Sequence, residues 1–312
     1  MSTRTLVRRS SAAYPSHLKE LQDPPSRLYV IGDIGLLQRP GIAIIGSRKA
    51  TAYGLAAAAR FAAFAARSGV TVVSGGAFGC DSRGHQAALD AGGKTVAVLG
   101  CGADIDYPRS QRSLLERVRR EGCVVSELPW GHPPARWAFP KRNRIIAGLS
   151  GLVLVVEAAL PSGTFSTADH ALAAGRDVLA VPGSVFSPTS EGTNRLIANG
   201  AIPICSEDDL AQALSLASLA PEGCAVSPPS TPADTSPGTD PHSTHLSKEA
   251  QKILSDLSAA PMKPAEIAER TGLDAQGVLI ALGELDAAGL VERLANGSVS
   301  ISQESLLRYH RG

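Results

Sequence analysis

The feature that most constrains the fold is an alternation, between residues 41 and 183, of short apolar segments with longer segments of helical character. Each apolar segment is a continuous run rich in β-branched residues, leucine and alanine, which is typical of a strand covered on both faces. Strands that alternate with helices in this way predict an α/β fold built on a parallel sheet. The predicted strands are residues 42–45, 70–73, 95–99, 123–126, 152–156 and 177–181.

The segments between these strands carry helix signals. Residues 53–68 are rich in alanine, and Gly69 stands where a left-handed helix end is expected. Residues 81–91 are a second predicted helix, with Asp81 as its N-cap. Right-handed crossovers bring the carboxyl ends of parallel strands to one edge of the sheet, so the loops at those ends are expected to form the ligand site.

Composition divides the chain into four parts. Residues 1–40 are mixed and polar, and we interpret them as an N-terminal lead-in segment, the remnant of a small helical module, which packs on a core of residues 41–220. Residues 221–245 are rich in Pro, Ser and Thr and are predicted to be a disordered linker. Residues 246–303 are the last predicted domain.

This last domain has three helical segments followed by a predicted hairpin, the pattern of a winged helix. Between residues 246 and 300 there are five Lys and Arg against eight Asp and Glu, and the third helical segment, residues 274–288, carries no cation. Because a helix that enters a DNA groove is normally basic, we expect this domain to bind a protein or to regulate the core. A sequence-specific transcription factor that acts through the winged helix is disfavoured for the same reason.

The clearest local charge feature is residues 139–150, where a cationic turn leads into an apolar run. No acidic residue occurs from Leu128 to Val156, so the cations have no carboxylate partner nearby in the sequence. A cationic turn beside a buried strand suits a large anionic ligand, and a solvated helix face is the alternative. The cations concerned are Arg136, Lys141, Arg142 and Arg144.

Four segments rich in glycine or in cations are expected to converge at the same edge of the sheet. Backbone N–H groups at helix starts, approached closely across glycines, form anion sites. Two alternatives remain open, namely that Gly75 and Gly76 form an ordinary tight turn and that Arg48 pairs with a carboxylate such as Asp81. The segments are residues 46–48, 74–80, 141–144 and 162–167.

The composition argues against several other classes of protein. The net charge is +1, so any positive charge that binds nucleic acid has to be local. The five cysteines are scattered, which predicts neither disulfides nor a zinc site and fits a reducing cytosol. No signal peptide and no apolar stretch of about 20 residues occur, so we expect a cytoplasmic protein with no membrane segment. No P-loop and no pairing of nucleophile with base are present, so we predict no catalytic residue, metal or cofactor.

The motifs in these loops resemble the DNA-processing protein A family, DprA, also called Smf. The match runs in the same order over roughly residues 14–210 and includes Phe-Pro-x-Arg-Asn-Arg at residues 139–144. The resemblance implies an extended Rossmann-like parallel sheet core with a C-terminal winged-helix-like module, and a homodimer formed through the core. It also implies a protein without catalytic turnover that binds single-stranded DNA, protects incoming DNA, and helps to load the RecA recombinase in natural transformation and recombination.

The resemblance assigns roles to particular residues. Arg48 and Lys141 are expected to grip phosphates, while residues 142–144 shape the pocket and residues 162–167 line it. This chain has Phe78 where the family pattern has arginine, so one expected cation is missing, and Phe78 either stacks a base or packs inward. The residues predicted to bind DNA are Ser47, Arg48, Ser74, Gly75, Phe78, Gly79, Lys141, Arg142, Asn143, Arg144, Ser162, Gly163, Thr164 and Thr167.

A nucleotide-processing enzyme is the rival interpretation. Rossmann-like nucleoside monophosphate phosphoribohydrolases have a Pro-Gly-Gly-x-Gly-Thr loop after a strand, and residues 161–164, with Glu157 just before them, are faintly similar. The glycine pair and the downstream glutamate of that motif are missing here. The sequence therefore favours a DNA-binding protein over this enzyme.

Overall fold

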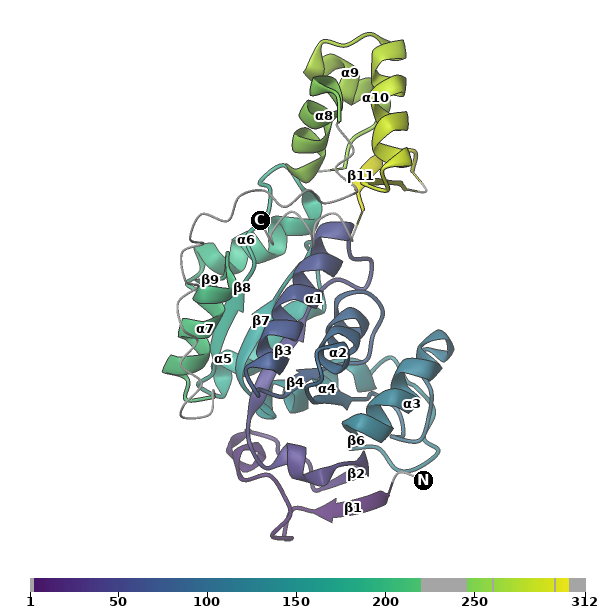
Figure 1. The fold of residues 1–312 in the computed structure, drawn as a ribbon. Coiled ribbons are helices and arrows are strands. Elements are labelled where there is room, and N and C mark those ends of the chain that lie inside the picture. Colours follow the sequence, from purple (N-terminus) through teal and green to yellow (C-terminus); the bar gives the residue numbers. More distant parts are fainter. Residues whose placement is uncertain (1–2, 220–245, 260, 295, 303–312) are drawn as a thin grey trace, which may run out of the picture. The chain divides into compact units, whose positions relative to one another are not determined.

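The computed structural model describes residues 3–219, 246–259, 261–294 and 296–302. The chain divides into two compact units, Met1–Cys224 and Ala225–Gly312, each with its own hydrophobic core (Figure 1). The linker predicted at residues 221–245 lies outside the described residues.

A single nine-stranded sheet runs through the described part of the first unit. In chain order its strands are β1 (Arg4–Arg8), β2 (Arg27–Gly32), β3 (Gly41–Ile45), β4 (Val72–Ser74), β5 (Thr95–Val98), β6 (Cys123–Ser126), β7 (Ser150–Val155), β8 (Asp177–Ala180) and β9 (Ile202–Pro203). Their spatial order is β1-β2-β6-β5-β4-β3-β7-β8-β9. All pairs from β6 to β9 are parallel, so the predicted parallel α/β core is confirmed.

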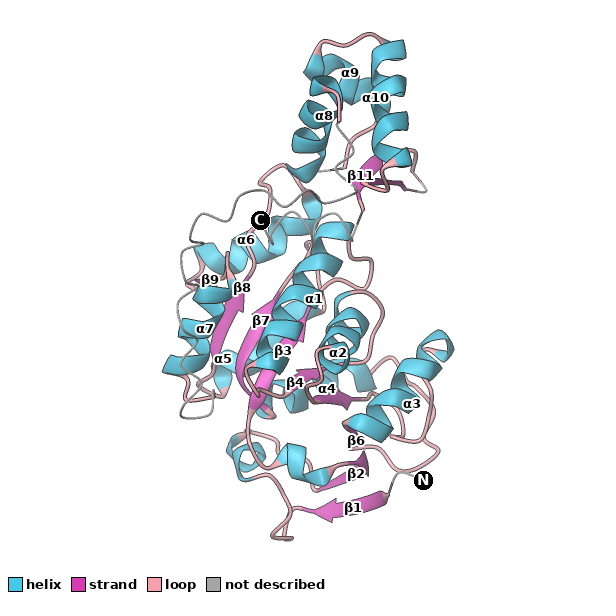
Figure 2. Ribbon diagram, in the orientation of Figure 1, coloured by secondary structure: helices cyan, strands magenta, loops and turns pink. Residues whose placement is uncertain are grey.

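Helices cover both faces of this sheet (Figure 2). Because side chains alternate along a strand, Ile45 and Val153 face one layer while Ile44 and Leu154 face the other. The first layer contains α4 (Ala138–Gly148), α5 (Thr164–Ala173) and α6 (Glu191–Ala198). The second contains α1 (Ala52–Arg67), α2 (Cys80–Asp90), α3 (Arg112–Glu121) and α7 (Glu207–Leu216).

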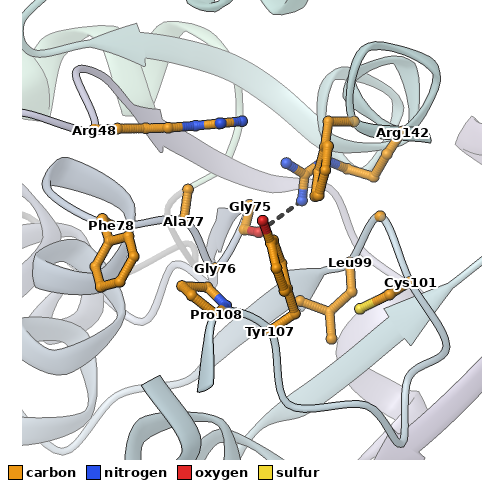
Figure 3. A pocket seen from close by; sticks show the side chains of 12 residues that line it. Arg48, Gly75, Gly76, Ala77, Phe78, Leu99, Cys101, Tyr107, Pro108 and Arg142 are labelled. Carbon is orange, nitrogen blue, oxygen red and sulfur yellow. Dashed lines mark hydrogen bonds between the residues drawn. The ribbon is translucent and has the colours of Figure 1, made fainter. Parts of the chain in front are cut away.

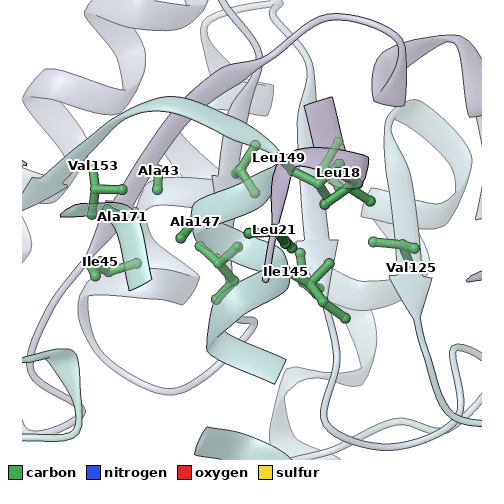
Figure 4. Close-up of a cluster of buried hydrophobic side chains, with 14 of the residues drawn as sticks. Leu18, Leu21, Ala43, Ile45, Val125, Ile145, Ala147, Leu149, Val153 and Ala171 are labelled. Carbon is green, nitrogen blue, oxygen red and sulfur yellow. The ribbon is translucent and has the colours of Figure 1, made fainter. Parts of the chain in front are cut away.

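The N-terminal segment differs from the prediction of a helical remnant. β1 and β2 pair with each other in antiparallel fashion, and β2 pairs in the same sense with β6, so they extend the sheet. Two short 3₁₀ turns, η1 (Ser16–Glu20) and η2 (Ile34–Leu37), complete the segment. Leu18 of η1 is fully buried, and it packs with Leu21 in the cluster around Ile145 and Leu149 (Figure 4). The segment therefore anchors α4, the helix that carries the cationic run.

The start of α2 also differs from expectation, because Asp81 is not its N-cap. Gly79 occupies that position, with a positive φ of 76° that glycine adopts without strain. The carboxylate of Asp81 accepts hydrogen bonds from the backbone N–H groups of Gly75 and Ala77, so it holds the glycine-rich turn rather than the helix end.

The second unit forms a winged helix, as predicted. It comprises α8 (Lys248–Ala259), α9 (Pro264–Thr271) and α10 (Ala275–Ala287), followed by the antiparallel strands β10 (Val291–Arg293) and β11 (Val299–Ile301). Ile253, Ile267 and Leu282 belong to its buried core. The exposed face of α10 presents Leu279 and Ile280, and the helix carries no cation. None of the helices described in the chain is both long and apolar enough to cross a bilayer.

Candidate nucleic-acid interface

One pocket opens at the carboxyl-end edge of the sheet, and all four predicted segments reach it. The loop after β3 contributes Ser47 and Arg48, and the loop after β4 contributes Ala77. Residues 142 and 143 line it from α4, and residues 161–164, 166 and 167 line it from the loop after β7 and the first turn of α5. The structure therefore brings the four segments together, as the parallel topology predicted.

Arg48 is the most accessible cation of this pocket. Its guanidinium carbon lies 5.5 Å from the centroid of the Phe139 ring, a distance at which a cation and an aromatic face attract each other. Within the described residues no carboxylate lies within ion-pair distance of it, so the alternative pairing with Asp81 is not realised. The preceding residue is fixed on both sides of its backbone, since the Ser47 N–H donates to the Glu157 carbonyl at 2.8 Å and the Ser47 carbonyl accepts from the Cys80 N–H at 3.2 Å.

Arg142 is buried, in contrast to Arg48. Its Nη1 donates to the carbonyl of Gly75 at 2.7 Å (Figure 3) and also to the carbonyl of Val98. Burial lowers the pKa of its guanidinium to about 10, while the nearby Asp81 carboxylate opposes this shift. Arg142 thus ties α4 to the ends of β4 and β5 and contributes its charge from below the pocket surface.

Gly75 lies next to both buried charged side chains, Arg142 and Asp81. An added Cβ would lie 2.6 Å from Arg142 Nη2 and 2.6 Å from Asp81 Oδ2, so only glycine leaves room for both. Burial raises the pKa of the Asp81 carboxyl, and the Arg142 charge and the two backbone N–H donors oppose that rise. The turn at Gly75 is therefore more than an ordinary tight turn, because a buried Asp81 and Arg142 hold it from both sides.

Arg144 and Lys141 have a carboxylate partner, which comes from just outside the acid-free stretch. Glu127, which directly precedes the acid-free stretch, lies 2.7 Å from Arg144 Nη2 and 4.0 Å from Lys141 Nζ. Arg144 is buried and also lies 3.4 Å from Asp23, so its charge is fully engaged. The Lys141 side chain remains 49% exposed and only loosely paired, which leaves it available to a ligand.

The other predicted residues divide between the surface and the core. Ser74 is buried, and its hydroxyl donates to the Ile44 carbonyl at 2.7 Å, so its role is to link β4 to β3. Asn143 Nδ2 donates to the Gly163 carbonyl at 3.4 Å and links α4 to the loop before α5. In that loop the Ser162 hydroxyl accepts a hydrogen bond from the Thr164 N–H at 3.2 Å, and Thr167 lines the pocket while being otherwise buried.

A second, adjoining pocket is lined by aromatic side chains (Figure 3). Phe78 is 44% exposed here, so it does not pack inward. Tyr107 is 42% exposed and stacks on Phe139, with 5.6 Å between the ring centroids and 30° between the planes. Tyr107 was not among the residues predicted to bind DNA, although its place in the loop that follows β5 was an available signal.

The surroundings of the Glu157 carboxylate argue against the enzyme interpretation. It is buried, and its carboxylate accepts from the Thr51 N–H at 2.9 Å and from the Thr51 hydroxyl at 2.6 Å. It therefore supports the start of α1 and does not line either pocket. Among the residues that the structure describes, no three His, Cys, Asp or Glu side chains gather where they could hold a metal ion.

Replacing Gly79 by alanine is expected to damage the Arg48 loop. The added Cβ would lie 2.2 Å from the Ser47 carbonyl oxygen and 2.9 Å from that of Arg48, at a φ of +76°. Strain and overlap together should lower the free energy of unfolding by about 2–4 kcal/mol, measured by urea denaturation. Gly92→Ala is the matched control, because Gly92 has a φ of +78° with no atom within 4 Å. Equal losses in the two variants would mean that the close approach at Gly79 is unimportant.

Comparison with known proteins gives a consistent result. Residues 5–215 match the family profile described as DNA recombination-mediator protein A, and residues 229–297 match the DprA winged helix domain. The chain is 35% identical to the protein Smf of Synechocystis sp. over 96% of its own length and 78% of the relative's. It is 39% identical to the DNA processing protein DprA of Streptococcus pneumoniae over 63% of this chain and 70% of that protein.

Two solved structures of such relatives share the fold of the first unit. The DprA structure from Streptococcus pneumoniae superposes with a TM-score of 0.64 at 36% identity, over 67% of this chain and 74% of that one. The Helicobacter pylori DNA processing protein A, described for its single-stranded DNA binding mode, superposes with a TM-score of 0.63 at 30% identity, over 69% of this chain and 96% of that one.

Proposed function

This chain belongs to the DNA recombination-mediator protein A family, and we propose that it binds single-stranded DNA across the two adjoining pockets at the carboxyl-end edge of its sheet. The observation that carries the proposal is the placement of an accessible cation, Arg48, beside the exposed rings of Phe78 and Tyr107. A second accessible cation, Lys141, lines a small hollow that adjoins this pocket. Cations that follow the backbone and rings on which bases stack are the two parts of a single-strand site.

In this proposal the residues have different roles. Arg48 and Lys141 contact phosphates, and the backbone around Ser162 to Thr167 offers N–H groups at the start of α5. Phe78 stacks on a base. This stacking compensates in part for the electrostatic attraction that the missing arginine would have supplied. Arg142 and Arg144 position these groups from below, because their own hydrogen bonds are made within the protein.

The exposed rings favour a single strand over a duplex. Bases in a duplex are paired and stacked on each other, so they cannot lie on a protein ring without being unstacked. The wider role that we propose, which rests on family membership, is protection of incoming single strands and loading of RecA recombinase in natural transformation. A homodimer formed through the first unit and the absence of catalytic turnover belong to the same proposal.

Binding of oligo-dT against duplex DNA of equal length, measured by fluorescence anisotropy at several salt concentrations, tests the proposed function. Two phosphate contacts, from Arg48 and Lys141, give an expected slope of log affinity against log salt of about −1.4 per protomer. A fourfold rise in salt should then weaken binding about sevenfold. A slope near −3 would mean that Arg142 and Arg144 also reach phosphates. A slope near zero, or a preference for duplex, would contradict the proposal.

A further inference from the structure

Trp137 is an exposed aromatic side chain that the pockets described above do not use. It stands immediately before α4, and 56% of it is accessible to solvent. Within the described residues its ring meets that of His132 edge to face, at 6.2 Å and 87°, and no aromatic ring covers it by stacking. The chain's other tryptophan, Trp130, is half-buried against Tyr29 and Arg4. Trp137 therefore does little for the core, and its exposed ring surface is available to a ligand.

Two exposed cations, Lys141 and Arg136, belong to the segment around Trp137. Lys141 lies one helical turn further along α4, where its N–H faces the Trp137 carbonyl at 3.5 Å, and the two side chains line the same small hollow. Arg136 is exposed next to it in the sequence. Glu127 also lines the hollow, but its carboxylate is held by Arg144 at 2.7 Å, so it does not cancel the charge of Lys141 and Arg136 together.

The hollow beside Trp137 continues the aromatic pocket. Both are lined by Leu99, Gly100 and Arg142, so they adjoin each other across the end of β5. The aromatic pocket in turn shares Arg48 and Phe139 with the pocket near α5. A chain of three hollows thus runs along the carboxyl-end edge of the sheet and ends at Trp137.

We propose that Trp137 is a further base-stacking platform, and that single-stranded DNA runs from the aromatic pocket over the start of α4 to reach it. This inference rests on the proposed function and adds to it the direction of the strand and a residue that the family motifs do not supply. Lys141 then lies between two stacked bases, one at Phe78 or Tyr107 and one at Trp137, where a phosphate of the linking backbone is expected. Removing one stacked base weakens single-strand binding by roughly five- to a hundredfold.

The test uses the emission of Trp137 itself. In the full-length Trp130→Phe variant, Trp137 is the remaining tryptophan, so stacking on a base should quench its fluorescence as labelled oligo-dT saturates the protein in a parallel anisotropy titration. Trp137→Ala should bind oligo-dT at least fivefold more weakly, Trp137→Phe should recover most of that loss, and Trp130→Phe should bind like the unmodified protein.

The outcomes separate this inference from the proposed function. Normal binding by anisotropy with unchanged Trp137 emission, or a Trp137→Ala variant that binds normally, would overturn the platform and leave the proposed function standing. No binding of oligo-dT by the unmodified protein would overturn both. Normal DNA binding by Trp137→Ala together with a change in its oligomeric state would instead identify the ring as a contact between protein chains.

Discussion

Replacing Arg48 and Lys141 together by glutamate is expected to lower the affinity for oligo-dT by at least about a hundredfold. A charge-assisted contact contributes roughly ten- to a hundredfold in affinity, and two such contacts are lost and replaced by repulsion. Both side chains are exposed, and neither carries a buried hydrogen-bond network, so the variant should remain folded. The measurement is anisotropy at fixed low salt, accompanied by thermal denaturation to confirm that the midpoint is unchanged.

Lys263→Glu is the matched control for this variant, because Lys263 is an exposed cation in the winged helix. It should change the affinity less than twofold, since the described part of that unit is acidic and α10 carries no cation. Equal losses in the two variants would move the DNA site to the winged helix. Retained affinity in the Arg48 and Lys141 variant would remove the pocket from consideration.

The fold was predictable where strands are continuous and apolar. β3 to β8 all correspond to predicted strands, because burial on both faces leaves a strong local signal. β1 was not predicted, because only one of its five residues is buried. Its partner β2 was visible only as a short apolar run, since pairing with β6, far along the chain, leaves no mark on nearby residues.

The site, like the fold, was predictable from the sequence only where its features are local. The convergence of four loops follows from parallel topology alone, so their glycines and cations are recognisable in the sequence. Which cations are accessible could not be predicted, because burial depends on groups brought from distant segments. Lys141 and Arg142 are neighbours in the sequence, yet the helix turns one outward to the hollow and the other inward onto the carbonyls of Gly75 and Val98. Glu127 neutralises Arg144 from just outside the acid-free stretch.

Arg142→Met tests the structural role inferred for the buried cation. The variant should lose about 3–5 kcal/mol of unfolding free energy, because it leaves the Asp81 carboxylate buried without its counter-charge and two carbonyls without a donor. Urea denaturation at pH 7 measures this loss. Arg144→Met is the matched control, since Arg144 is equally buried but is paired with the partly exposed Glu127.

The pH dependence distinguishes a buried charge pair from mere loss of packing. Burial raises the Asp81 pKa in the folded state, so the folded protein binds this proton more tightly than the unfolded chain. The associated stability is therefore present at low pH and is lost as pH rises through the folded pKa. Without Arg142 the pKa of Asp81 rises further, so the unfolding free energy of Arg142→Met should fall from about pH 4 upward more steeply than that of the unmodified protein or of Arg144→Met.

Adding Asp81→Asn to Arg142→Met should remove this pH dependence and restore part of the stability. A loss of unfolding free energy that does not depend on pH and that Asp81→Asn does not relieve would show that Arg142 acts by packing alone. The shape of the pocket would then be set by the packing of α4 and not by the buried charge of Arg142.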